Sequence, residues 1–274
     1  MKQFFEQEEL QTNRSFLYGD GVFESIRIFN GKIPFLRQHY ERMLQGAKYL
    51  HIDITTQLTF SNFEQRIKVA VGGIANCRLR VTLFRIGGGY YTPTSNRPEL
   101  IMQGEILPSA QFELNEQGLQ ADWYEQHTVY PNIISNAKTC NALPYVLAAI
   151  YKKQYQLDDV LLLNHNNFVV EASSANVFIV KDKQLITPPL TDGCVAGTMR
   201  RVVLKSARHL DLNPVEKSIT KSDCLSAEEL WLTNAISGIR WVHTLVQQPF
   251  KRPQFAPLMV QRLNQIVQKG TFVG

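Results

Sequence analysis

The segment S-N-A-K-T-C-N-A-L (residues 135–143) opens the part of the chain that decides its fold, and it places Lys138 just before a predicted helix at 142–155. The segment V-V-E-A-S-S-A-N-V-F (169–178) follows, with Glu171 inside an otherwise apolar strand. The segment G-C-V-A-G-T-M-R-R (193–201) closes this part with a Gly-Thr turn that leads into another predicted helix. A lysine, an acid on a strand and a helix N-terminus in this order point to one shared ligand.

The second half of the chain predicts more strands than helices. Strands are expected at 121–130, 159–164, 168–171, 176–180, 230–233 and 239–245, and helices at 142–155, 198–209 and 256–269. Several neighbouring strands are joined too closely for parallel crossovers, and 164–167 reads as a tight turn. We therefore expect a mostly antiparallel sheet or barrel that is flanked by helices.

The first half predicts a smaller α+β domain with an antiparallel sheet. Turn residues at 19–21 precede a strand at 22–29, and the Asn30-Gly31 pair that follows is a strong hairpin signal. Helices are expected at 36–50 and 61–71, and strands at 77–84 and 100–106. Residues 107–115 lose periodicity and contain a proline. We therefore expect an α+β chain of two domains, 1–106 and 116–274, with 107–115 as linker.

Composition indicates a cytoplasmic protein. The 274 residues are 44% apolar, the first ten carry charges where a signal peptide needs an apolar run, and no stretch approaches the roughly 20 apolar residues of a membrane helix. The four cysteines form no C-x-x-C pair, which favours reduced thiols over disulfides or a metal site. We therefore expect no membrane and no metal partner. We also expect no nucleic-acid partner, because the net charge of +5 is spread along the chain.

Lys138 is the first candidate for chemistry. Burial or a neighbouring cation lowers the pKa of a lysine, and the free amine can form a Schiff base with a carbonyl cofactor and later move protons. Most lysines at helix starts are ordinary surface residues. Small neighbours and Pro144 in the first helical turn make Lys138 less typical of that class.

Two further features complete a possible ligand site. Glu171 either faces solvent or keeps a pyridine nitrogen protonated, so that the ring can absorb carbanion electrons. Gly197 and Thr198 begin a helix whose first N–H groups suit a phosphate, although they also fit a routine N-cap. Arg42 is a second phosphate candidate, although such a residue is more often solvated. Gly87-Gly88-Gly89 lacks the ending of a phosphate loop and reads as a flexible loop.

An aldehyde for the amine, a ring nitrogen for the acid and a phosphate for the helix are all present in pyridoxal 5'-phosphate (PLP). Six motifs along nearly the whole chain resemble the class IV aminotransferase family, the fold-type IV PLP enzymes. They are Y-G-D-G-V-F-E-S-I-R (18–27), H-Y-E-R-M-L (39–44), K-T-C-N-A-L (138–143), E-A-S-S-A-N-V-F (171–178), G-T-M-R (197–200) and L-T-N-A-I-S-G-I (232–239).

The resemblance implies roles for particular residues. Lys138 would bind the cofactor aldehyde, Glu171 would partner the pyridine nitrogen, and Arg42 would bind the phosphate. The backbone amides of Thr198 and Met199 would help to bind the phosphate. The resemblance also implies a small α+β domain, a larger barrel-like domain and a homodimer in which loops of one subunit complete the other's site. A small-molecule amino substrate is implied, and the hypothesised substrate contacts are Phe23, Arg27 and Arg85.

The subclass depends on features that disagree. The short chain, R-I-G-G-G-Y-Y (85–91), G-C-V-A-G-T-M-R (193–200) and T-N-A-I-S-G-I (233–239) resemble 4-amino-4-deoxychorismate lyases. Many aminotransferases have Ile-Thr where this chain has Thr198-Met199, and a threonine where it has Ala235. Glu24 is more typical of aminotransferases, whereas the spacing from Lys138 to Asn141 argues against the branched-chain pattern. We expect a lyase, with an amino-acid aminotransferase as the alternative and a non-catalytic basic binding protein as a remote one.

Overall fold

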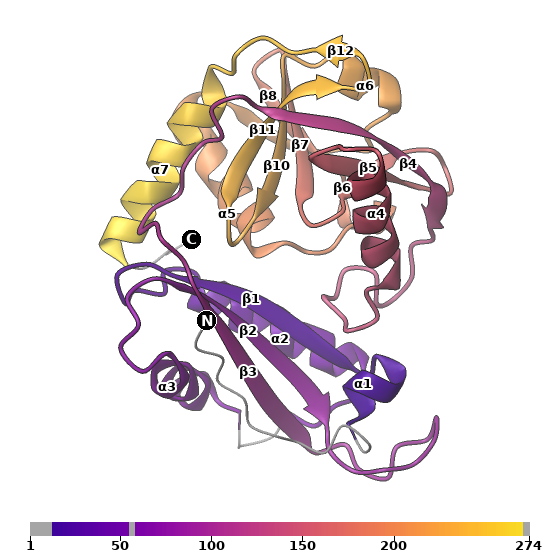
Figure 1. Cartoon of the computed structure of the whole chain (residues 1–274), viewed down its shortest axis with the longest axis vertical. Helices are drawn as coiled ribbons and strands as arrows, with labels where there is room; N and C mark the ends of the chain where they lie inside the picture. The colour runs from indigo at the N-terminus through magenta and orange to yellow at the C-terminus, as the bar shows by residue number, and fades with distance from the viewer. Residues whose placement is uncertain (1–12, 55–57, 271–274) are drawn as a thin grey trace. The chain divides into compact units, whose positions relative to one another are not determined.

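The computed structural model describes residues 13–54 and 58–270, and the chain forms two compact units (Figure 1). The described residues of the first unit are 13–54, 58–111, 137–142 and 269–270, and those of the second are 112–136 and 143–268. The chain enters the second unit after Gln111, within the segment expected to be a linker. Residues 1–10, on which the expectation of no signal peptide rests, lie outside the described residues.

The first unit is built on a three-stranded antiparallel sheet in the order β1-β2-β3. Its strands are β1 (Gly21–Ile28), β2 (Cys77–Arg85) and β3 (Pro98–Ile106), and its helices are α1 (Arg14–Tyr18), α2 (Leu36–Tyr49) and α3 (Phe60–Val71). Buried and partly exposed residues alternate along β1 and most of β2, because successive side chains of a strand point to opposite faces. The predicted small α+β domain with an antiparallel sheet is confirmed.

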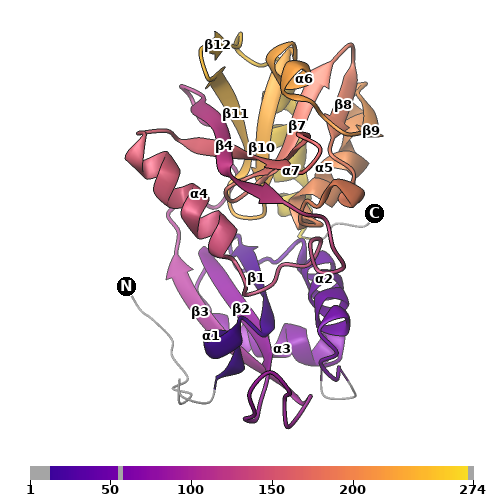
Figure 2. The same cartoon turned by 90° about the vertical axis from the view of Figure 1, so that its right-hand side faces the viewer.

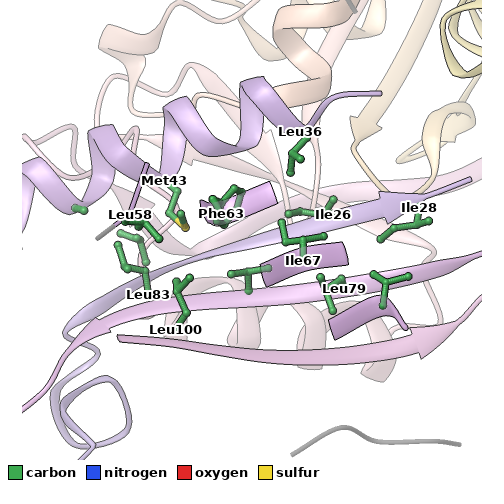
Figure 3. Close-up of a cluster of buried hydrophobic side chains, with 14 of the residues drawn as sticks. Ile26, Ile28, Leu36, Met43, Leu58, Phe63, Ile67, Leu79, Leu83 and Leu100 are labelled. Atoms are coloured by element: carbon green, nitrogen blue, oxygen red, sulfur yellow. The ribbon is translucent and has the colours of Figure 1, made fainter. Parts of the chain in front are cut away.

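The core of this unit lies between one face of the sheet and the two longer helices (Figure 3). Ile26 and Leu79 face Met43 of α2 and Phe63 of α3, and all four side chains are almost completely buried. Burial of each such side chain stabilises the fold by about 1.5–3 kcal/mol. A Cβ at Gly46 would lie 2.8 Å from Val22 Cγ1, so this glycine lets α2 approach β1 closely.

The Asn30-Gly31 pair forms its turn but not the expected hairpin. Both residues have positive φ (47° and 75°), and Phe29 and Lys32 exchange backbone hydrogen bonds across the turn. The pairing stops at that bridge, because the chain after the turn enters α2 instead of a second strand. The hairpin prediction was therefore wrong beyond the turn, and the short helix α1 was not predicted.

The second unit contains a closed barrel of six strands within a nine-stranded sheet. The strand order is β10-β11-β4-β5-β6-β7, and β7 also pairs with β10, which closes the ring. The six strands are β4 (Leu119–Val129), β5 (Asp159–Asn164), β6 (Val169–Ala172), β7 (Asn176–Lys181), β10 (Glu229–Asn234) and β11 (Gly238–Leu245). One hydrophobic cluster takes side chains from all six strands, so it fills the barrel.

Most strand pairs of this unit are antiparallel, as predicted, but β4 pairs in parallel with both β5 and β11, and β8 (Gln184–Thr187) pairs in parallel with β9 (Asn213–Glu216). The strands β8, β9 and β12 (Gln248–Pro249) extend the sheet beyond the ring and were not predicted. Around the barrel lie α4 (Leu143–Gln154), α5 (Thr198–Ser206), α6 (Lys221–Leu225) and α7 (Phe255–Lys269), with 3-10 turns η1 (Leu190–Asp192) and η2 (Ala207–Leu210). Helix α4 packs along β4 and β5, where Figure 2 shows its full length.

Within residues 13–54 and 58–270, no helix combines the length and the apolar character that crossing a membrane requires.

Candidate functional site

The Lys138 segment is held against β1 like a short extra strand. Phe23 N–H donates to the Lys138 carbonyl at 2.8 Å, Cys140 N–H donates to the Gly21 carbonyl at 2.8 Å, and Thr139 bridges to Val22. Lys138 is half-buried, and its Nζ lies 4.5 Å from the centroid of the Phe23 ring. The backbone of Lys138 is therefore fixed in a way that an ordinary surface lysine before a helix does not require.

A second cation shares the Phe23 ring. Arg80 comes from β2 opposite Ser25, and its Cζ lies 3.6 Å from the ring centroid, within the range of a cation–π contact. Burial lowers the pKa of Arg80, the charge of nearby Cys140 opposes this, and Arg78 adds to the lowering. Sequence reasoning missed Arg80. The alternation in C-R-L-R-V-T-L-F could have found it, because it places Arg80 on the face opposite the core.

On the other face of β1, Glu24 is buried in a charged network. Glu24 Oε1 accepts a hydrogen bond from Arg42 Nε at 2.8 Å, and Oε2 pairs with Arg42 Nη2 and with His39 Nδ1, the latter at 2.6 Å. Burial tends to raise the pKa of Glu24. The charge and hydrogen bond of Arg42, together with the contact from His39, outweigh burial and lower the pKa to about 2.

The same network determines the pKa of His39 and the burial of Arg42. Burial lowers the pKa of His39, the hydrogen bond and charge of Glu24 oppose this, and the charges of Arg42 and Lys138 add to the lowering. The network is thus a buried Arg42–Glu24 ion pair beside a neutral imidazole. The Arg42 side chain is only 12% exposed, so the solvated-arginine interpretation does not describe it.

Arg85 and Arg27, the hypothesised substrate contacts, bind groups of the first unit. Arg85 Nε contacts Asp20 Oδ2 at 3.0 Å, Nη1 donates to Asn96 Oδ1 at 2.5 Å, and Nη2 donates to the Leu50 carbonyl. Arg27 Nη2 donates to the Ser109 carbonyl at 2.8 Å. Both guanidinium groups therefore join segments of the first unit to each other.

The Gly87–Gly89 loop also has a structural partner. Arg14 Nη1 donates to the carbonyls of Gly89 at 2.9 Å and Tyr90 at 2.7 Å. In these contacts the loop presents carbonyl oxygens to a cation, whereas a phosphate loop must present N–H groups to an anion.

In the second unit, Glu171 is a buried acid with a donor on each oxygen. It lies on β6 and is 3% exposed, which excludes the solvent-facing alternative. The Tyr145 hydroxyl donates to Oε1 at 2.5 Å, and Val195 N–H donates to Oε2 at 3.2 Å. Burial raises the pKa of Tyr145 far above its ordinary value, and the charge and hydrogen bond of Glu171 raise it further. Sequence reasoning missed Tyr145, because helical periodicity does not show a contact with a distant strand.

The N-terminus of α5 is shaped by Gly197. A Cβ at Gly197 would lie 1.8 Å from Asn176 Oδ1, so only glycine fits against the side chain from β7. As the N-cap residue, Gly197 offers no side-chain acceptor to the first N–H groups of α5. Thr198 and Met199 follow directly and are 4% and 1% exposed. The positive end of this helix therefore suits an anion such as phosphate.

The turn between β10 and β11 contains Ala235. Asn234 Oδ1 accepts from Ile236 N–H at 3.0 Å and Ser237 N–H at 2.8 Å, which holds the turn. On β10, Thr233 pairs with Asn176, and its buried hydroxyl has no hydrogen-bond partner in the part of the chain that the structure describes. Three features are consistent with a phosphate-bearing cofactor. They are the Thr233 hydroxyl, the start of α5 without a side-chain cap, and the close contact of Gly197 with Asn176.

Among the residues that the structure describes, no three His, Cys, Asp or Glu side chains lie close enough together to hold a metal ion.

Comparison with known proteins matches most of the chain. The sequence profile described as Amino-transferase class IV matches residues 21–245. A protein of Methanocaldococcus jannaschii assigned as a branched-chain-amino-acid aminotransferase is 32% identical over 231 residues, 81% of this chain and 77% of that protein. The aminodeoxychorismate lyase of Vibrio harveyi is 28% identical and covers 83% of each chain. The branched-chain aminotransferase of Thermoproteus uzoniensis superposes with a TM-score of 0.86 at 24% identity, covering 98% of this chain and 95% of that one.

We expect Gly197→Ala to destabilise the protein by about 1–3 kcal/mol, because the new methyl group overlaps the Asn176 side chain. Adding Asn176→Ala removes the overlap, so the double variant should lose less stability than the sum of the two single variants. Urea denaturation measures each free energy of unfolding. Gly88→Ala is the control, since nothing lies within 4 Å of its Cβ position. Strict additivity of the two substitutions would refute the steric explanation.

The depressed pKa of Glu24 predicts sensitivity to acid. Its charge stabilises the fold above the ordinary value of 4.5, and this contribution is lost as the pH falls towards 2. Between pH 5 and pH 2.5, wild type should lose roughly 2 kcal/mol more stability than Glu24→Gln. Urea midpoints at both pH values measure this difference. Glu64→Gln on α3 is the control, because Glu64 is partly exposed and pairs with Lys68. Parallel losses in wild type and Glu24→Gln would contradict the prediction.

Proposed function

The chain belongs to the amino-transferase class IV family of PLP-dependent enzymes, and from this premise we propose that it acts on a small anionic amino substrate by moving a proton through Lys138. The observation that carries the substrate proposal is the shared Phe23 ring. The Lys138 amine lies 4.5 Å from its centroid and the Arg80 guanidinium 3.6 Å. An amine and a guanidinium that both contact the Phe23 ring support an amino compound with a carboxylate as the substrate.

The cofactor contacts are proposed on the chemistry of the donors. PLP supplies a protonated ring that can take up negative charge from a substrate carbon. We assign the ring nitrogen to Glu171 and the phosphate to Arg42 and to the backbone N–H groups of Thr198 and Met199. The uncapped start of α5 supports the phosphate assignment, and the two hydrogen bonds that Glu171 accepts support its role as an anion. Ala235 would contribute only backbone, because its side chain has no hydroxyl.

We propose 4-amino-4-deoxychorismate as the substrate. In this reaction Lys138 removes the proton from the carbon that bears the amine. The bond to the enolpyruvyl oxygen then breaks, and the ring becomes aromatic, giving 4-aminobenzoate and pyruvate. The similarity to the Vibrio harveyi lyase supports this choice, as does the Arg80 cation for a substrate carboxylate. We favour Arg80 over Arg85 and Arg27 for that carboxylate, since Arg85 and Arg27 bind other groups of the first unit.

An amino-acid aminotransferase is the second candidate. Lys138 would then move the proton from the substrate Cα to the C4' carbon of the cofactor. The buried Glu24, which is more typical of aminotransferases, and the 32% identity to the Methanocaldococcus jannaschii protein favour this candidate. The two activities differ in the form in which they leave the cofactor, which makes them separable in a single experiment.

We also propose a homodimer in the cytoplasm. Helix α4 exposes Leu143, Val146, Leu147 and Ile150, which repeat at helical spacing and form an apolar stripe that a second copy could cover. The four cysteines are unpaired, and three of them are buried, which fits a reducing compartment.

The cofactor form after one half-reaction separates the two candidate activities. Holoenzyme is mixed with one amino substrate and no keto acid, and the absorbance spectrum is followed. A lyase returns the aldehyde form after aminodeoxychorismate is consumed, and leucine, glutamate and D-alanine leave its spectrum unchanged. Accumulation of the amine form with any of these amino acids would refute the lyase and support the aminotransferase. Lys138→Ala should abolish turnover, whereas Lys48→Ala, an exposed lysine on α2, should retain it.

Substitution of Arg80 tests the proposed carboxylate contact. Arg80→Gln should raise KM roughly 10- to 100-fold, because a charged hydrogen bond is worth about 1.5–3 kcal/mol. The comparison is Arg66→Gln, which removes an exposed arginine from α3 that pairs with Glu99. Steady-state kinetics with aminodeoxychorismate, or with whichever amino acid reacts, measures the effect. Equal KM values in the two variants would remove Arg80 from the substrate site.

A further inference from the structure

The Tyr145 hydroxyl is fixed on the buried carboxylate of Glu171. Tyr145 lies in the first turn of α4, and its ring packs against the cluster of Tyr124, Val160 and Leu162 between that helix and the sheet. From this position the hydroxyl reaches Glu171 Oε1 at 2.5 Å. A tyrosine ring has few torsions, so a packed ring leaves the oxygen little freedom to move.

Tyr145 and Val195 each donate a hydrogen bond to the Glu171 carboxylate. Burial and the negative charge of Glu171 raise the pKa of Tyr145, so the phenol keeps its proton at any working pH. The second group is a backbone N–H, that of Val195, which cannot accept. Hydrogen bonds donated to a carboxylate stabilise its charged form. The two donated hydrogen bonds therefore favour the anion of Glu171, against the effect of its burial.

We propose that Tyr145 is a positioning residue that holds Glu171 as an oriented anion, so that the proton between Glu171 and the cofactor ring nitrogen stays on the nitrogen. This inference rests on the proposed function, which assigns the ring nitrogen to Glu171. A proton shared by two groups resides on the more basic one, and the phenol makes the carboxylate less basic. The ring then keeps the positive charge that lets it take up electrons from the substrate carbon.

A substitution can remove the hydrogen bond of the Tyr145 hydroxyl without changing the packing of the Tyr145 ring. Tyr145→Phe keeps the ring in the α4 cluster and removes only the oxygen that contacts Glu171. Tyr155→Phe is the matched control. It removes a phenol hydroxyl one residue beyond the end of α4, from a side chain that is 54% exposed.

The first measurement uses the cofactor-free protein, so it does not depend on the proposed function. Carbon-13 NMR of labelled glutamate carboxyl groups, with the Glu171 signal assigned through Glu171→Gln, follows protonation as the pH is lowered. Glu171 should convert to the carboxylic acid at a higher pH in Tyr145→Phe than in wild type or Tyr155→Phe. Identical titrations in the three proteins would overturn the proposal.

The second measurement uses the holoenzyme with cofactor labelled with nitrogen-15 in the ring. In Tyr145→Phe the ring signal should move from the pyridinium position towards neutral pyridine, and kcat should fall roughly tenfold with KM nearly unchanged. A pyridinium signal and a kcat that match wild type would overturn the role of Tyr145 at the cofactor. A neutral ring already in wild type would instead refute the assignment of Glu171 to the ring nitrogen, and the carbon-13 titration would then still decide whether Tyr145 holds the anion.

Discussion

The pairing of the Lys138 segment with β1 is the constraint on which the first unit's candidate residues depend. Two backbone hydrogen bonds, from Phe23 to Lys138 and from Cys140 to Gly21, fix the backbone of the Lys138 segment relative to the strand. Because neighbouring residues of a strand point to opposite faces, Phe23 and Glu24 then belong to different surroundings. One face brings Lys138 and Arg80 to an aromatic ring, and the other buries an ion pair.

The buried Arg42–Glu24 ion pair is not an efficient way to stabilise the fold. Removing two charges from water costs several kcal/mol each, and a buried pair is often matched or exceeded by apolar residues of similar size. Here the pair gains from a two-point contact between Arg42 and Glu24 and from His39 on the remaining lone pair. The arrangement fixes the orientation of the Arg42 side chain, because two of its guanidinium nitrogens are bound to the Glu24 carboxylate.

Periodicity and turn chemistry predicted most of the fold, since the helices at 36–50 and 61–71 and the barrel strands are set by local patterns of apolar residues. The motifs identified the family and the cofactor, and both are confirmed. The hairpin expected at Asn30-Gly31 was wrong beyond the turn, because the chain continues into α2 and no second strand follows the turn directly. Tyr145 was missed because its contact with Glu171 joins elements far apart in sequence. Arg80 was missed although the alternation along β2 places it on the face opposite the core.

The protonation states of the candidate residues follow one pattern. Glu24 is surrounded by Arg42 and His39, and Glu171 by the Tyr145 hydroxyl and the Val195 N–H, so donors to both carboxylates favour the anion. A carboxylate held in this way is a weak base, and a phenol whose pKa is raised is a weak acid. We propose the amine of Lys138, whose backbone is held against β1 and which lies beside the Phe23 ring, as the group that removes a proton from the substrate.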